Sequence, residues 1–252
     1  MKLFFDLFLF VPKIGKIRAF LTDAERQMNE DFYDIARKNM VLGQLVPQQI
    51  TNQAVLDAMA AVPRERFLAE RKRSLAYADE PICLKGRRFM CEPLILARLL
   101  QAADVRSGDF VLNPQCATGY TTLILSRLAQ AVVAVEDDSE MNAIAQDILI
   151  EMKTDNVGLF SSPAKDGFAA QAPYDLIFID GIVPFVPENL FAQMAENARM
   201  ICVVAEPPSL IGHALKISAS NGKIRREWLF NFLLNPFCQT QNDKKFVFED
   251  VS

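Results

Sequence analysis

The chain has 252 residues, of which 51% are hydrophobic, and its 27 basic and 31 acidic residues give a formal net charge of −4. This composition excludes a disordered chain, a collagen and a polytopic membrane protein, and it predicts one large globular domain with or without a small appendage. The slight negative charge argues against a nucleic-acid-binding protein, whose surface usually carries a basic patch. Glycine is scarce: 10 of the 252 residues are glycine, which is about 4%, whereas glycine usually makes up about 7% of globular chains.

Cysteine and histidine are too few and too scattered for most metal and hydrolase chemistry. The five cysteines lie far apart and form no CxxC pair, and the single histidine is His213. This pattern argues against structural zinc and a disulfide framework, and it predicts free thiols in a reducing cytoplasm. No G-x-S-x-G motif accompanies His213, so a Ser-His-Asp hydrolase is not indicated. We expect a cytoplasmic protein without a metal site.

The first 27 residues are predicted to form an extension of the folded part. Residues 1–11 are an apolar run that is far shorter than the ~20 residues of a membrane-spanning helix. No small-residue cleavage site follows the run, as a signal peptide would require. Two interpretations stay open. In the first, this segment has no function of its own: it is a loosely attached extension, or the start codon is placed too early and Met28 is the true initiator. In the second, residues 1–20 contact a membrane surface.

Helices dominate the next part, residues 28–105. A capping-box spacing at Thr22–Glu25 predicts the start of the first helix, apolar residues at helical spacing predict the second, and Pro93 favours the start of the third. The charged stretch 64–90 predicts a surface connection with one or two helical turns. The expected helices cover residues 23–40, 52–62 and 93–105.

From residue 106 onward, short apolar runs alternate with helical stretches. The expected strands are 109–112, 131–135, 157–160, 176–179 and 200–204, the expected helices are 118–129, 139–152 and 187–197, and later, antiparallel strands are expected at 213–218, 228–234 and 245–248. Fully apolar strands that alternate with helices are typical of a doubly wound, mostly parallel α/β sheet. The chain therefore divides into the extension 1–27, a helical part 28–105 and a Rossmann-like domain 106–252.

Ligands of such folds bind at the carboxyl ends of the parallel strands. Glu136 follows the second strand, 17 residues beyond Gly119. A carboxylate at this position accepts hydrogen bonds from both hydroxyls of a nucleotide ribose in many βαβ units. The alternative is an acid at a helix N-terminus that the helix dipole favours, although Asp137 and Asp138 already fill that role.

Several blocks of the sequence resemble the protein-L-isoaspartate O-methyltransferase family, in its order and spacing. These blocks are Ala36–Pro47, Val55–Leu68, Ser74–Ile82, Glu92–Ala103, Ala172–Gly181 and Phe246–Phe248. The resemblance spans about residues 30–250 and implies a Rossmann-like methyltransferase fold. It further implies S-adenosyl-L-methionine as cofactor and isoaspartyl-containing proteins or peptides as partners.

The implied reaction is protein repair. A methyl group passes to the α-carboxylate of an L-isoaspartyl residue, and the ester then cyclises to a succinimide that can reopen to aspartate. Because a carboxylate attacks the sulfonium methyl group directly, positioning and desolvation supply most of the rate. The lack of a catalytic histidine is therefore compatible with this reaction.

The cofactor loop departs from the family pattern D-[IVL]-G-x-G-[ST]-G-Y. The resemblance assigns Asn113, Gln115, Ala117 and Gly119 to the cofactor. Of the family's three glycines, this chain retains only the last, Gly119. Gln115 and Ala117 add side-chain atoms where glycine permits close approach, and Pro114 lacks a backbone N–H.

Further positions of the implied site differ from the family as well. Cys91 replaces a serine near the substrate carboxylate, which makes it the candidate catalytic residue, with a small buried hydrophobic side chain as the alternative. Pro163 replaces an acid near the adenine, and Asp180 matches a segment that lines the site. Three alternatives stay open for Arg87 and Arg88: an electropositive setting for the Cys91 thiol, a pair with an anionic substrate, or simple solvated charge.

Two hypotheses follow for function. The first is an isoaspartyl methyltransferase with a divergent cofactor loop. The second is a catalytically inactive homologue that keeps the methyltransferase fold as a binding or scaffold protein, because broken local rules without visible compensation indicate changed function. A methyltransferase that acts on another carboxylate or amine is a third choice.

Overall fold

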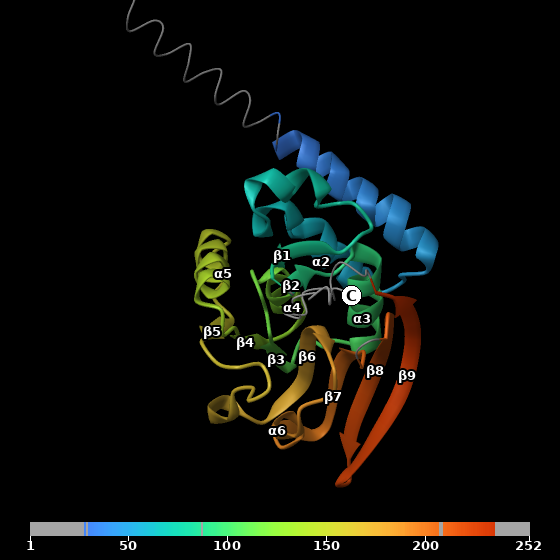
Figure 1. Ribbon diagram of the computed structural model, residues 1–252, viewed down its shortest axis with the longest axis vertical. Coiled ribbons are helices and arrows are strands. Elements are labelled where there is room, and N and C mark those ends of the chain that lie inside the picture. The colour runs from blue at the N-terminus through green and yellow to red at the C-terminus, as the bar shows by residue number, and fades with distance from the viewer. Residues whose placement is uncertain (1–27, 29, 87, 207–208, 235–252) are drawn as a thin grey trace, which may run out of the picture.

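The computed structural model describes residues 28, 30–86, 88–206 and 209–234. A sheet of seven strands forms the centre of the molecule, in the order β5-β4-β3-β6-β7-β8-β9 (Figure 1). Its strands are β3 (Phe110–Pro114), β4 (Ala131–Val135), β5 (Val157–Phe160), β6 (Tyr174–Val183), β7 (Met194–Val204), β8 (Ile211–Ser220) and β9 (Lys223–Leu233). The expected extension 1–27 and the expected strand 245–248 lie outside the described residues.

The strands β3 to β7 pair in parallel, and β8 and β9 add to β7 in antiparallel orientation. This arrangement confirms the Rossmann-like, mostly parallel sheet with antiparallel C-terminal strands. The chain runs outward from β3 to β5 and then returns to place β6 on the other side of β3. The strand order thus reverses between β3 and β6, which is where open α/β sheets bind ligands.

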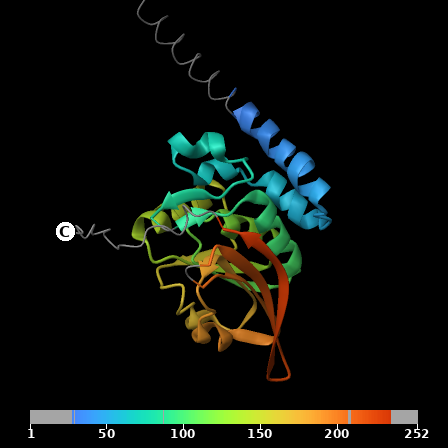
Figure 2. The ribbon, with the colours of Figure 1, turned by 45° about the vertical axis from the view of Figure 1, so that its right-hand side comes forward.

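Most of the expected helices are confirmed. They are α2 (Gln53–Ala61), α3 (Pro93–Ala103), α4 (Tyr120–Leu128) and α5 (Ser139–Glu151). A helix over residues 30–40 lies at the periphery of the molecule (blue in Figures 1 and 2) and continues as one π-helical and one 3-10 turn over Val41–Leu45 and Val46–Gln48. Helix α2 begins where the Asn52 side chain accepts the N–H of Val55 at 3.3 Å, an ordinary N-cap.

The helix expected over 187–197 is largely wrong. Helix α6 covers only Glu188–Phe191, and β7 already begins at Met194. The buried side chain of Gln193 explains this early end, because its Nε2 donates to the carbonyl of Asp166 at 2.8 Å and its Oε1 accepts the N–H of Phe168 at 2.8 Å. These bonds hold the chain in extended form, so that β7 can pair with the start of β6.

A small hairpin in the charged connection 64–90 was not predicted. The two 3-10 helices Arg64–Phe67 and Glu70–Leu75 agree with the expected helical turns, but β1 (Ile82–Lys85) and β2 (Arg88–Met90) then form a separate antiparallel sheet. The hairpin lies between the N-terminal helices and the central sheet (Figure 1). Of the hairpin residues that the structure describes, the two at its ends, Ile82 and Met90, are the buried ones.

Two buried arginines connect these layers. On β7, Arg199 forms an ion pair with Asp109, which lies just before β3, and its Nε donates to the carbonyl of Ala103 at 2.8 Å. In the N-terminal part, the fully buried Arg64 donates its Nε to the carbonyl of Ala76 at 2.6 Å and also bonds to the carbonyl of Cys91. Each guanidinium thus connects segments that are distant in the sequence.

Candidate cofactor and substrate site

The loop between β3 and α4 lies at the point where the strand order reverses. Gln115, Ala117 and Gly119 all have left-handed backbone, with φ of 63°, 52° and 89°. The first two adopt a conformation that an L-residue enters at a cost of about 1–2 kcal/mol. The loop therefore has glycine-like backbone conformations at residues 115 and 117, where the chain has no glycine.

Gly119 has a packing role in addition to its conformation. A Cβ atom at this position would lie 3.2 Å from the Cβ of Ala145 on α5. The close approach of α5 to the start of α4 therefore requires glycine here. This contact supplies a structural reason for the presence of Gly119.

The side-chain amide of Asn113, at the end of β3, forms hydrogen bonds within the protein interior. Its Nδ2 donates to the carbonyl of Phe178 on β6 at 2.8 Å, and its Oδ1 accepts the hydroxyl of Thr122 on α4 at 2.6 Å. The residue is completely buried. Asn113 thus connects β3, β6 and α4, and its amide is used by these neighbours.

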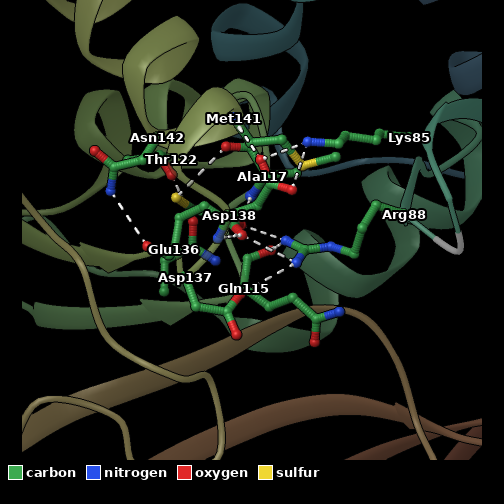
Figure 3. Close-up of polar contacts among 12 residues, drawn as sticks. Lys85, Arg88, Gln115, Ala117, Thr122, Glu136, Asp137, Asp138, Met141 and Asn142 are labelled. Atoms are coloured by element: carbon green, nitrogen blue, oxygen red, sulfur yellow. Dashed lines mark hydrogen bonds and ion pairs between the residues drawn. The ribbon is translucent and has the colours of Figure 1, made fainter.

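Glu136 is the electrostatic centre of the site (Figure 3). Its buried carboxylate accepts the N–H of Ala117 at 2.7 Å and the N–H of Asp138 at 3.0 Å. Arg88 of β2 binds both carboxylate oxygens, through Nη1 at 3.0 Å and through Nη2. Glu136 directly follows β4, as expected, and its carboxylate is bound by an arginine of the same chain.

The hairpin also directs a second cation to the same strand end. Lys85 of β1 lies 2.8 Å from Oδ2 of Asp138 and 2.7 Å from Oε2 of Glu140 (Figure 3). Arg88 additionally donates to the carbonyl of Gln115 at 3.2 Å. Arg88 is therefore not simply solvated, which was one of the alternatives, because it pairs with the acids at the end of β4. Arg87 lies outside the described residues.

Cys91 lies near two carboxylates, and the guanidinium of Arg64 binds its main-chain carbonyl. Its Sγ is 3.7 Å from Oε2 of Glu92. Burial, together with the negative charges of Glu92 and Asp180, raises the pKa of the Cys91 thiol well above its ordinary value. A reactive thiolate needs the opposite, electropositive surroundings, so Cys91 remains a neutral thiol.

Asp180 on β6 is the carboxyl group of this site with the largest resolved change. Burial raises its pKa to about 6, although a hydrogen bond with Thr121 and the charges of Arg88 and Arg64 act in the other direction. Burial is also the main reason that the pKa of Glu92 is raised. The substrate side of the site thus holds two carboxyl groups whose pKa values are raised by burial.

The raised pKa of Asp180 predicts a pH-dependent stability. Between about 4 and about 6, the folded chain keeps a proton on Asp180 that the unfolded chain releases, so the free energy of unfolding falls as the pH rises through this window. Across this window, the free energy of unfolding of the wild-type chain should fall by about 2–3 kcal/mol more than that of Asp180→Asn. Urea denaturation at a series of pH values measures this difference. Asp104→Asn, at an exposed carboxylate, serves as control and should leave the wild-type slope in place.

A small cavity connects the substrate-side residues. It has a volume of about 20 Å³ and is lined in part by Phe89, Cys91, Glu92, Asp180 and Gly181. Such a volume holds about one water molecule, whereas pockets for drug-sized ligands measure about 300–1,000 Å³.

The groups expected to contact S-adenosyl-L-methionine are bonded within the protein in this structure. The ribose-type carboxylate of Glu136 already receives Arg88 and two backbone N–H groups, and the Asn113 amide is used inside the protein. The Gln115 side chain reaches toward β6, where its Nε2 would lie 3.7 Å from a Cβ at Gly181. These contacts fill the edge between β3, β4 and β6 where the cofactor is expected.

The structure brings together most of the residues that the sequence singles out. Residues 113–119 and Glu136 form one cluster through direct contacts, and Cys91 and Asp180 line the adjoining cavity. Sequence reasoning missed the contact of Lys85 and Arg88 with the acids at residues 136–140. The clustering of basic residues at 85–88 and acidic residues at 136–140 was the available signal.

The described residues include no helix long and apolar enough to cross a membrane. In the same part of the chain, no group of three or more His, Cys, Asp or Glu side chains is placed to hold a metal ion. The cysteines at 83, 91, 116 and 202 have free thiols.

Comparison with known proteins agrees with the fold and the motifs. The sequence model of the family described as protein-L-isoaspartate(D-aspartate) O-methyltransferase matches residues 36–227, more than half of the chain. A protein-L-isoaspartate O-methyltransferase of Koribacter versatilis is 35% identical over 175 residues, which are 69% of this chain and 79% of that protein. One from Anaeromyxobacter sp. is 34% identical over 165 residues, 66% of this chain and 68% of that protein.

Solved structures show the same fold. A protein-L-isoaspartate O-methyltransferase has a TM-score of 0.70 at 22% identity, with 79% of this chain and 65% of that chain covered. A Plasmodium falciparum structure described as such an enzyme in complex with S-adenosyl-L-homocysteine has a TM-score of 0.67 at 18% identity, with 79% and 96% covered. The chain therefore belongs to the protein-L-isoaspartate O-methyltransferase family, and this membership assigns to it the S-adenosyl-L-methionine-dependent methylation of isoaspartyl residues in protein repair.

Proposed function

We propose that this chain itself binds S-adenosyl-L-methionine and methylates the α-carboxylate of L-isoaspartyl residues in proteins or peptides, at the carboxyl ends of β3, β4 and β6. The observation that carries the proposal is Glu136, whose carboxylate is held at the end of β4 by the N–H groups of Ala117 and Asp138. This is the position of a ribose acid in nucleotide-binding βαβ units. Family membership supports the reaction and the partner class.

On the substrate side, we propose that Cys91 contacts the isoaspartyl carboxylate as a neutral thiol. Burial and the neighbouring acids raise the pKa of this thiol, which suits a weak hydrogen-bond donor and not a nucleophile. The substrate carboxylate is itself the nucleophile, so the protein's role is to position and desolvate it. The free thiols and the family support a cytoplasmic site of action.

The test is methyl-ester formation on an isoaspartyl peptide, with the matching aspartyl peptide as control. We expect transfer to the isoaspartyl peptide alone. Glu136→Ala should abolish this transfer. Cys91→Ser, which supplies a stronger donor, should raise kcat by about 10-fold, because one hydrogen bond contributes about 1 kcal/mol and each ~1.4 kcal/mol changes a rate tenfold. Cys83→Ser changes an exposed thiol on the hairpin and should have no effect. Absence of any methyl ester at millimolar cofactor contradicts the proposal.

The ion pair between Arg88 and Glu136 favours a second candidate, a catalytically inactive binding or scaffold protein. In that case the arginine permanently neutralises an acid that no longer meets a cofactor. The same assay separates the two candidates: the second requires that the chain forms no ester and binds no cofactor, yet still binds the isoaspartyl peptide in preference to the aspartyl one.

A further inference from the structure

We propose that the hairpin β1–β2 is an intramolecular latch, in which the guanidinium of Arg88 occupies the ribose position on Glu136 and the cofactor site opens when Arg88 leaves. The proposal rests on the proposed function, since it concerns access of the cofactor to the same site. It reconciles the retained acid at the end of β4 with the fact that an arginine of the same chain already binds both oxygens of its carboxylate.

The geometry of the contact imitates a ribose. Two hydroxyls of a ribose would donate to the two oxygens of the Glu136 carboxylate, and here two guanidinium nitrogens of Arg88 bind these same oxygens. A planar guanidinium matches a carboxylate in this bidentate way, and charge strengthens both bonds. The guanidinium also bonds to the carbonyl of Gln115 at 3.2 Å, which fixes its orientation in the site (Figure 3).

The hairpin is suited to release because its middle is weakly held. Ile82 and Met90 are buried at its ends and anchor it. Residues 83–86, 88 and 89 are exposed or half-buried, and Gly86 has a left-handed backbone with φ of 55°. A two-stranded hairpin is only marginally stable by itself. Motion of its tip therefore disturbs little of the core.

Among the ion pairs that the described residues of the hairpin form with the acidic strand end, the pair of Arg88 with Glu136 is the most buried. Side-chain exposure is 0% for Glu136 and 20% for Arg88, but 50% for Lys85 and 68% for its partner Glu140. An exposed pair contributes little, whereas a buried carboxylate needs a partner. The ion pair of Arg88 with Glu136 thus sets how often the site is open, and Lys85 has a minor part.

Binding of a cofactor to a latched site weakens in proportion to the open fraction, since the apparent Kd is the intrinsic Kd divided by that fraction. The latch therefore predicts that Arg88→Ala binds S-adenosyl-L-homocysteine about 10–100-fold more tightly than the wild-type chain. Isothermal titration calorimetry measures both constants. Lys85→Ala removes a cation from the same hairpin and should change Kd by less than about threefold, because it leaves Glu136 paired.

A competition experiment adds a readout that a purely structural role would not move. In Arg88→Ala, free methylguanidinium at millimolar concentration should occupy the vacated position and weaken binding of S-adenosyl-L-homocysteine, whereas methylammonium, which is not bidentate, should compete less. Circular dichroism establishes that each variant is folded. If Arg88→Ala does not fold, Arg88→Gln provides the same comparison with a polar side chain that lacks the charge.

An unchanged or weaker affinity in folded Arg88→Ala and Arg88→Gln overturns the latch, as does a lack of competition by methylguanidinium. The proposed function fails independently of these results. If Arg88→Ala binds the demethylated cofactor tightly but forms no methyl ester on the isoaspartyl peptide, the latch stands and the activity does not. If the wild-type chain forms the ester and loss of Arg88 leaves affinity unchanged, the activity stands and the latch does not.

Discussion

Replacement of Arg199 by leucine is expected to lower the free energy of unfolding by about 3–5 kcal/mol, as is usual when one partner of a buried ion pair is removed. The variant strands the Asp109 carboxylate in the interior, with only the N–H of Arg106 left as a donor at 2.7 Å. It also leaves the carbonyl of Ala103 without its bond to Arg199. Urea denaturation monitored by circular dichroism measures the loss.

Arg106→Ala is the matched control for this variant. Its guanidinium pairs with Asp104 on the surface, where the arginine side chain is 65% exposed, and its backbone N–H remains available to Asp109. The control should change stability by less than about 1 kcal/mol. Equal effects of the two substitutions would show that burial of Arg199 does not determine its contribution.

The second large effect is expected for Arg64→Leu. The fully buried guanidinium bonds to the carbonyls of Ala76 and Cys91 and lies 4.8 Å from the ring centroid of Tyr120. Hydrogen bonds that involve a charged group contribute about 1.5–3 kcal/mol each, so we expect a loss of about 3–5 kcal/mol in the free energy of unfolding. Because the carbonyl of Cys91 is released, affinity for the isoaspartyl peptide should fall as well.

The neighbouring Arg66 provides the comparison, since it pairs with Glu151 at the surface. Arg66→Ala should lower stability by no more than about 1 kcal/mol and leave peptide affinity unchanged. A stable Arg64→Leu variant with wild-type affinity would rule out the proposed link between the connection 64–76 and the substrate side. Both quantities come from denaturation curves and peptide titrations of the same preparations.

The fold was largely predictable because its strands are short, apolar and separated by helices of ordinary length. The expected strand 131–135 agrees with β4 at both ends, since its valine and alanine residues form one apolar run between the polar Gln130 and Glu136. The end of α6 was not predictable in the same way. It depends on the side chain of Gln193, whose bonding partners lie up to 27 residues earlier in the chain.

The site shows the same division between local and distant information. The position of Glu136 follows from its place directly after a strand, and the departures of the cofactor loop are visible residue by residue. The partner of Glu136 is 48 residues away in a hairpin with little apolar patterning. Sequence periodicity indicates which face of an element is buried, but not which two charged side chains the folded chain brings together.

Glycine normally gives a loop two properties together: a left-handed backbone conformation and space free of side-chain atoms. At Gln115 and Ala117 the loop has the first property without the second. The loop already has the turn that glycine would permit, and the N–H of Ala117 already points at Glu136. Glycine at either position would therefore remove side-chain atoms and relieve backbone strain without redirecting the hydrogen bonds of the loop. The main chain of this loop thus already has the conformation of a nucleotide-binding loop, and only a few side chains obstruct it.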